Sequence, residues 1–306
     1  MHIIKQVSLA VLLASLPTLI VNAAGIEILN TDEVVVGSGG TGLSAAASAH
    51  QNGAKDIVLE KLPLIGGSSA LAGGAIAAGN SNLQKRSGTK NVSDDGFAKI
   101  WIKAQERSFP GGDEAMPDEK RIHKAVREFD KTVNWMEDTI GYKFAAPRPF
   151  GYGGPDYAHA PAESPVPASG RVSSPAGGRF VIKAFKAYLD KEGVPVMTGT
   201  RAEELITDGK GNVIGVKASK GNQKLEIRAK AVVLGTGGYA RNQELLQQYT
   251  PSYAPFTEES NATRGATGDG IIMAKKIGAA GFKDGWVMGL KPVSPQKELS
   301  YPFRTK

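Results

Sequence analysis

The chain has 306 residues, enough for one large or two ordinary domains, and its 41% hydrophobic and 22% charged residues are typical of a soluble globular protein. It contains no cysteine, which excludes disulfides, iron–sulfur ligation and covalent c-type haem within this sequence. Its 37 basic and 30 acidic residues give a formal charge of +7, but no basic stripe with interleaved aromatic residues occurs, so we expect no nucleic-acid partner.

Residues 1–24 have the pattern of a secretory signal. Lys5 provides a short positive start, residues 7–21 are apolar, and Val21-Asn22-Ala23 offers a small-residue cleavage site. The apolar run is short for a membrane span, and a buried N-terminal helix is the alternative. We therefore expect cleavage after Ala23 or Ala24, a mature chain without a membrane span, and a periplasmic location.

Residues 33–60 have the pattern of a dinucleotide site: an apolar strand, a glycine turn, a small-residue helix and a second apolar strand that ends on Glu60. The glycines would let the chain turn sharply at the end of the strand and would let a pyrophosphate approach the backbone. The N-terminus of the following helix would then face the phosphates. Glu60 would accept both ribose hydroxyls of an adenosine. The alternative is a glycine-rich turn in some other α/β unit. The predicted cofactor residues of this turn are Gly37, Gly39, Gly40, Thr41 and Gly42.

A second glycine cluster follows at residues 66–74, where two Gly-Gly pairs frame two serines. Backbone that lies flat against a planar ring system would need so many glycines, and a mobile glycine loop is the alternative.

These two segments, "VVVGSGGTGLSAAASAH" and "IVLEKLPLIGGSSALAGGAIAAG", resemble the flavoprotein of the soluble fumarate reductase and flavocytochrome c family. That family belongs to the succinate dehydrogenase, fumarate reductase and aspartate oxidase group. The resemblance implies that FAD lies along the second cluster. Gly67 stands where membrane-bound members carry a histidine bonded to the flavin, which implies non-covalent FAD. The FAD residues that the resemblance implies here are Lys61, Gly66, Gly67, Ser68, Ser69, Gly73 and Gly74.

Residues 80–140 read as polar helices with apolar stripes facing a core. One stripe contains Trp101, Ile102 and Ala104, and another runs from Ile122 to Met136. Residues 145–178 read as a long loop rich in proline and glycine, which is typical of a functional or mobile segment. Its end, "RVSSPAGG", resembles the loop that precedes the next helix in the family.

Residues 179–192 predict a helix, and four short strands follow at residues 194–197, 203–207, 213–217 and 225–227. We interpret these strands as an antiparallel β ribbon inserted into the domain. The resemblance implies that backbone at Ala202 contacts the adenine.

Residues 231–234 are wholly apolar, which predicts a buried parallel strand. The following "GTGG" resembles the family's "ATGG" return to the nucleotide and implies contacts from Thr236, Gly237 and Gly238. NAD-binding domains lack this second signature. In "ATGDG", before a helix predicted at residues 271–280, the resemblance implies a cofactor contact from Asp269, and a helix N-cap at this position is the alternative.

The predicted fold class is α/β: a Rossmann-like FAD-binding domain over residues 25–285, with a parallel sheet, helices on both of its faces and the inserted ribbon. Residues 286–306 would begin a truncated capping domain. Lys291-Pro292 stands near the family's His-Pro pair, so Lys291 is a candidate for holding a substrate carboxylate, with altered selectivity. The family's proton-donating arginine would lie beyond Lys306.

The function implied by the resemblance is hydride transfer from FAD to an unsaturated carboxylic acid such as fumarate or urocanate. A separate cytochrome or an FMN-bearing domain or protein would supply the electrons, and no metal site is expected. Two alternatives remain open: a truncated FAD-binding product without catalytic activity, and an NAD-dependent dehydrogenase with a chance glycine pattern.

Overall fold

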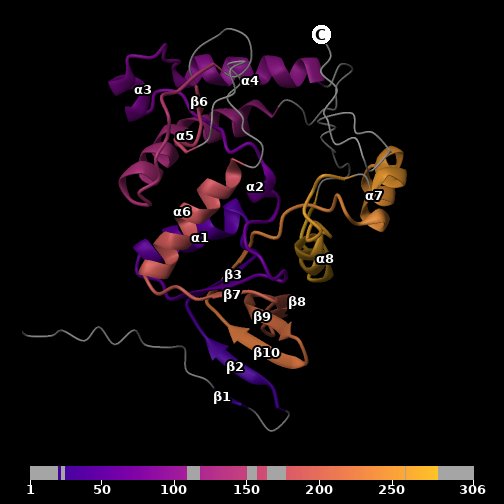
Figure 1. The fold of residues 1–306 in the computed structure, drawn as a ribbon. Helices are drawn as coiled ribbons and strands as arrows, with labels where there is room; N and C mark the ends of the chain where they lie inside the picture. Colours follow the sequence, from indigo (N-terminus) through magenta and orange to yellow (C-terminus); the bar gives the residue numbers. More distant parts are fainter. Residues whose placement is uncertain are drawn as a thin grey trace, which may run out of the picture.

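A parallel sheet of four strands, in the order β11-β3-β4-β7, forms the centre of the protein (Figure 1). The computed structural model describes residues 20–21, 25–108, 118–149, 157–163, 177–258 and 260–281. Every strand pair in this central sheet is parallel, which confirms the predicted α/β class. The strands are β3 (Glu33–Val36), β4 (Asp56–Leu59), β7 (Val196–Met197) and β11 (Ala231–Leu234).

Two helices, α1 (Gly40–Gln51) and α6 (Gly178–Lys191), cover one face of the central sheet (Figure 1). Val35 and Val58 point to this face and share a buried cluster with apolar residues of both helices. Successive side chains of a strand point to opposite faces, so the neighbouring residues Val34 and Ile57 point to the other side.

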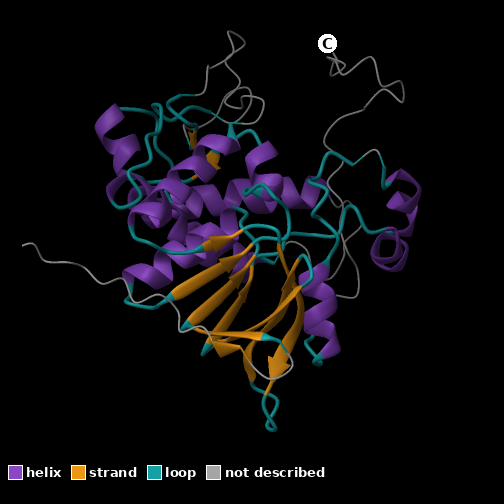
Figure 2. Ribbon diagram, turned by 60° about the horizontal axis from the view of Figure 1, so that its bottom comes forward, coloured by secondary structure: helices purple, strands orange, loops and turns teal. Residues whose placement is uncertain are grey.

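That other side is covered by a second sheet, in the order β1-β2-β10-β9-β8, and the strands of both sheets gather beneath the helices in Figure 2. The prediction of helices on both faces is therefore wrong. The apolar faces of the two sheets bury each other, and helix α8 (Asp269–Lys276) adds only Met273 to this cluster. The strands are β1 (Ile20–Val21), β2 (Glu27–Asn30), β8 (Thr200–Thr207), β9 (Val213–Lys220) and β10 (Gln223–Arg228).

Strands β8, β9 and β10 form the antiparallel ribbon that the sequence predicts. The predicted strand at residues 194–197 does not belong to it, because β7 pairs parallel with β4 in the central sheet. Strand β2, which we did not predict, pairs parallel with β10. A short apolar run indicates that a strand is present, but it does not indicate which strand it pairs with.

Strand β11 is less buried than predicted. Ala231 is exposed and the next three residues are half-buried, because β11 lies at the edge of the sheet within the described chain. Its parallel pairing with β3 is confirmed.

A separate helical layer contains α3 (Asn82–Ser87), α4 (Asp94–Ser108) and α5 (Glu119–Asp138). The α5 stripe is confirmed, since Ile122, Val126, Val133 and Met136 are all buried. The α4 stripe is shifted: Phe97 and Ala98 are fully buried, whereas Ala104 is exposed. None of the described helices is long and apolar enough to cross a bilayer.

Part of the predicted loop at residues 145–178 is ordered by pairing: β5 (Ile76–Ala77) and β6 (Ala158–His159) form a small antiparallel sheet. His159 is fully buried and its Nε2 lies 2.7 Å from Ser81 Oγ, so it joins this sheet to α3.

The second glycine cluster contains a short helix, α2 (Gly67–Leu71), which we did not predict. After β11 come α7 (Gln243–Tyr249) and the 3-10 helix η1 (Pro251–Phe256).

Several predictions fall outside the described residues. These are most of the signal segment, residues 171–176 of "RVSSPAGG", Lys291 and the capping segment at residues 286–306.

Candidate cofactor site

A cavity lies where the turns after β3, β4 and β11 meet, at the carboxyl ends of three parallel strands. Ligands of open α/β sheets bind at this edge, because the loops there converge and helices begin there. The cavity is lined by Val36, Gly37, Ser38, Gly39, Gly40, Thr41, Leu59, Glu60, Lys61, Leu62, Gly67, Ser68, Ser69, Thr200, Ala202, Gly235, Thr236, Gly237, Gly238, Thr263, Gly265, Ala266 and Asp269.

The glycines of the first turn have different structural roles. Gly37 has a φ of +104°, and a Cβ there would lie 2.4 Å from the carbonyl oxygen of Gly235, so it turns the chain and allows two loops to touch. A Cβ on Gly42 would lie 1.8 Å from the carbonyl oxygen of Gly37, which ties the first turn of α1 to the loop. At Gly39 the nearest atom to such a Cβ, Ser69 Oγ, is 3.7 Å away. The packing at position 39 therefore does not require a glycine, and the space beside Gly39 is open to a ligand in the cavity.

Helix α1 begins at this cavity with Gly39 as its N-cap, and this glycine has no side chain that could accept from the first N–H groups of the helix. One of its first backbone groups, Gly40 N–H, donates to Ser69 Oγ at 3.0 Å, which joins the two glycine segments. A helix N-terminus carries a partial positive charge and orients N–H groups toward an anion. The arrangement suits a pyrophosphate.

Glu60 follows β4 and is 7% exposed. Its Oε2 accepts hydrogen bonds from Ser38 N at 3.0 Å and Ser38 Oγ at 2.5 Å, and its Oε1 accepts one from Leu62 N at 2.8 Å. The carboxylate is thus held in one orientation beside the cavity.

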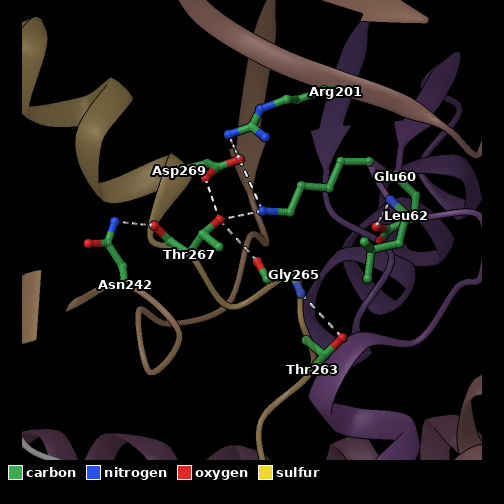
Figure 3. A network of polar contacts seen from close by, with 9 residues as sticks. Glu60, Leu62, Arg201, Asn242, Thr263, Gly265, Thr267 and Asp269 are labelled. Carbon is green, nitrogen blue, oxygen red and sulfur yellow. Dashed lines mark hydrogen bonds and ion pairs between the residues drawn. The ribbon is translucent and has the colours of Figure 1, made fainter. Parts of the chain in front are cut away.

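A polar network closes the side of the cavity next to Glu60 (Figure 3). Lys61 Nζ donates to Thr267 Oγ1 at 2.6 Å and to Asp269 Oδ2 at 3.1 Å, and Arg201 Nη2 lies 3.0 Å from the same Oδ2. Burial by itself would raise the pKa of Asp269, but hydrogen bonds from Thr267 and Lys61 and the charges of Lys61 and Arg201 outweigh it and lower this pKa. Asp269 is therefore ionised at neutral pH and joins β8, α8 and the end of β4.

Most residues predicted for the cofactor line this one cavity, although they come from five separate parts of the sequence. Gly42, Gly66, Gly73 and Gly74 do not line it. Gly66 has a φ of +104° and caps α2, and a Cβ on Gly74 would lie 2.5 Å from Gly177 C, so part of the glycine content of this segment serves its own packing. Their predicted place beside a flavin ring stays a prediction.

Sequence reasoning missed several lining residues, of which Ser38 has the most contacts. It lies between two glycines of the first turn, where the glycine pattern specifies no residue type, and its hydroxyl finds partners only when Glu60 and Gly66 come close to it in the folded chain. Thr263 was also missed; its N–H donates to Ser68 Oγ at 3.2 Å. Thr200 lies two residues before Ala202 on β8, so the alternation of the strand could have indicated it.

The described residues fit the ADP half of FAD. They provide a helix N-terminus with a glycine N-cap, a glycine turn with room at Gly39, and a buried carboxylate directly after the second strand, where dinucleotide sites of this kind bind a ribose. No histidine, cysteine or tyrosine is among the described lining residues. Within the described part of the chain, no three His, Asp or Glu side chains gather as metal ligands.

Comparison with known proteins agrees with this geometry. A urocanate reductase from Eggerthella lenta is 31% identical over 252 residues, which are 82% of this chain and 38% of that protein. A fumarate reductase (cytochrome) from Shewanella frigidimarina is 32% identical, over 81% of this chain and 40% of that protein. The open conformation of a flavocytochrome c3 fumarate reductase superposes with a TM-score of 0.69 at 27% identity, over 84% of this chain and 42% of that one.

The chain thus spans about two fifths of the length of these relatives. Residues 32–295 match the model of one protein family, described as "FAD binding domain". This match includes both glycine segments, the β ribbon and the network around Asp269, and its cofactor is FAD. The chain belongs to this family of FAD-binding domains.

Proposed function

We propose that this chain is the FAD-binding part of a reductase that adds hydride to the double bond of an unsaturated carboxylic acid. The observation that carries the proposal is the cavity at the carboxyl ends of β3, β4 and β11, in a chain that matches urocanate and fumarate reductases over most of its length. Relatives that share a fold can differ in substrate, so the acid itself must be tested.

The described residues would bind and orient the cofactor. Glu60 and Lys61 would hold the adenosine, the N-terminus of α1 would hold the pyrophosphate, and the segment that begins at Gly66 would lie beside the ring. FAD would be bound without a covalent link, since Gly67 offers no side chain. Bound FAD would supply the hydride.

Substrate and electron donor belong to the same proposal. The ammonium of Lys291 would hold one carboxylate of the substrate as a point charge. A cytochrome, or an FMN-bearing domain or protein, would deliver the electrons; the 306 residues given contain no cysteine that could attach a c-type haem.

An anaerobic oxidation experiment tests the proposed reaction. The FAD-bound chain is reduced with a stoichiometric amount of dithionite, and fumarate, urocanate or the saturated control succinate is then added. Recovery of the oxidised flavin absorbance with fumarate or urocanate, accompanied by the reduced acid in equal amount, would support the proposal. Residues 1–306 alone should show no recovery at an enzymatic rate, because the family's proton-donating arginine would lie beyond Lys306. The same experiment on a protein extended to the length of the relatives is therefore the decisive one, and recovery there with none of the unsaturated acids would contradict the proposal and favour FAD binding without catalysis.

We also propose export to the periplasm, which the apolar residues 7–21 and Val21-Asn22-Ala23 support. Cleavage there would remove β1, which pairs with β2 through only Ile20 and Val21 and leaves the β2–β10 pairing intact. The N-terminus of periplasmic protein should be Ala24 or Gly25. An intact Met1 on cytoplasmic protein would contradict export.

A further inference from the structure

Ser38 links the first glycine turn both to the second glycine segment and to Glu60, the carboxylate proposed to bind the ribose. Its hydroxyl donates to Glu60 Oε2 at 2.5 Å, and its Oγ also accepts from Gly66 N at 3.3 Å. Its backbone N–H donates to the same Glu60 oxygen at 3.0 Å, and its carbonyl oxygen accepts from Gly66 N at 3.0 Å. Ser38 is fully buried, so water does not compete for these bonds.

These contacts limit what Glu60 can offer to a ligand. A carboxylate has about four acceptor positions, two on each oxygen. Ser38 occupies both positions of Oε2, through its N–H and its hydroxyl, and Leu62 N occupies one position of Oε1. One position remains, on Oε1.

We propose that Ser38 restricts Glu60 to one of the two ribose hydroxyls of FAD, so that Ser38 is a positioning residue that determines which hydroxyl is recognised. This differs from our expectation that Glu60 accepts both hydroxyls. The inference rests on the cofactor of the family and not on the proposed reductase reaction, so it stands or falls independently of the anaerobic test.

ADP and its deoxy forms probe this without the flavin ring. The cofactor is removed from the complete chain, and ADP, 2′-deoxy-ADP and 3′-deoxy-ADP are titrated calorimetrically. In the wild-type protein one deoxy form should bind about tenfold to a hundredfold more weakly than ADP, which is the value of a hydrogen bond to a charged group. The other should bind within about threefold of ADP, because its missing hydroxyl has no free position on Glu60.

The Ser38→Ala variant then tests the cause. It removes the hydroxyl donor and frees a position on Glu60 Oε2, so a second hydroxyl can be accepted. The two deoxy forms should then be weakened to within about threefold of each other. Ser48→Ala is the matched control: Ser48 is exposed on α1, and its removal should leave the wild-type preference unchanged.

Two outcomes would overturn the proposal. One is a wild-type protein that loses equal affinity with both deoxy forms, because Glu60 would then accept both hydroxyls or neither. The other is a Ser38→Ala protein that keeps the wild-type preference. The wild-type comparison needs no variant, so the proposal remains testable even if Ser38→Ala does not fold.

Discussion

The ammonium of Lys61 lies 3.1 Å from the carboxylate of Asp269, although the two residues are 208 positions apart in the sequence. Both side chains are largely buried, at 17% and 12% exposure. This contact joins the end of β4 to the start of α8 across one wall of the cavity. A partly buried ion pair with a shared hydroxyl partner resists separation more than a surface pair does.

Lys61→Ala should therefore loosen this wall. Asp269 would keep Arg201 and Thr267 but lose its least exposed cation. We expect the free energy of unfolding of the cofactor-free protein to fall by roughly 1–3 kcal/mol and FAD affinity to fall about tenfold. Urea unfolding and FAD titration measure the two quantities. Lys183→Ala, an exposed lysine on α6, is the control, and equal behaviour of both variants would contradict the role of Lys61.

Glu60→Ala should weaken FAD binding about tenfold or more, since a hydrogen bond to a charged group contributes ~1.5–3 kcal/mol. It also leaves Ser38 N and Leu62 N without their acceptor, so the cofactor-free protein should be less stable. Glu60→Gln keeps the shape and one carbonyl acceptor and should lose less stability. Unchanged FAD affinity in Glu60→Ala would show that the adenosine does not lie beside β4.

Gly39→Ala and Gly42→Ala separate binding from folding. The added methyl at Gly42 would lie 1.8 Å from the carbonyl oxygen of Gly37, so this variant should lose about 3 kcal/mol or more. At Gly39 it has room, and unfolding should change by about 1 kcal/mol at most. FAD affinity of Gly39→Ala should nevertheless fall at least tenfold, because the methyl occupies the approach of the pyrophosphate. A Gly39→Ala protein with normal FAD affinity would place the pyrophosphate elsewhere.

Asp56 should make the stability of the protein depend on pH. Burial, followed by the charges of Glu33 and Asp32, raises its pKa from 3.8 to about 7, and neither of its oxygens has a hydrogen-bond partner. The folded state therefore holds this proton more tightly than the unfolded chain does. The resulting stability is fully present below about pH 4 and is lost as the pH rises toward 7.

Asp56→Asn mimics the protonated carboxyl at every pH and should remove this dependence. Relative to wild type it should gain on the order of 2–4 kcal/mol at pH 8 and little at pH 4. Denaturant unfolding at both pH values measures the difference, with the exposed Asp138→Asn as control. His50 Nδ1 lies 3.8 Å from Asp56 Oδ2 and Glu192 faces the other ring nitrogen, so His50→Ala would show what this contact adds. A constant difference between wild type and Asp56→Asn would contradict the buried proton.

The sequence by itself determined the local units of the site. The sequence predicted the β3–α1–β4 unit, the position of Glu60 at the end of β4, and the parallel pairing of β11 with β3. These features could be predicted because turn glycines, helix starts and apolar runs are patterns of residues close together in the chain. The α5 stripe was readable for the same reason.

Only the tertiary structure decided which units meet. An apolar run has the same appearance whether it pairs with β4 or with a ribbon, so β7 was assigned to the wrong sheet. From the sequence, either a helix or a sheet could cover the face of β3 that carries Val34 and Val36. In the folded structure a second sheet covers it. The partners of Ser38 and Asp269 come from distant segments, and burial against those segments, not local propensity, gives their polar groups a place in the site.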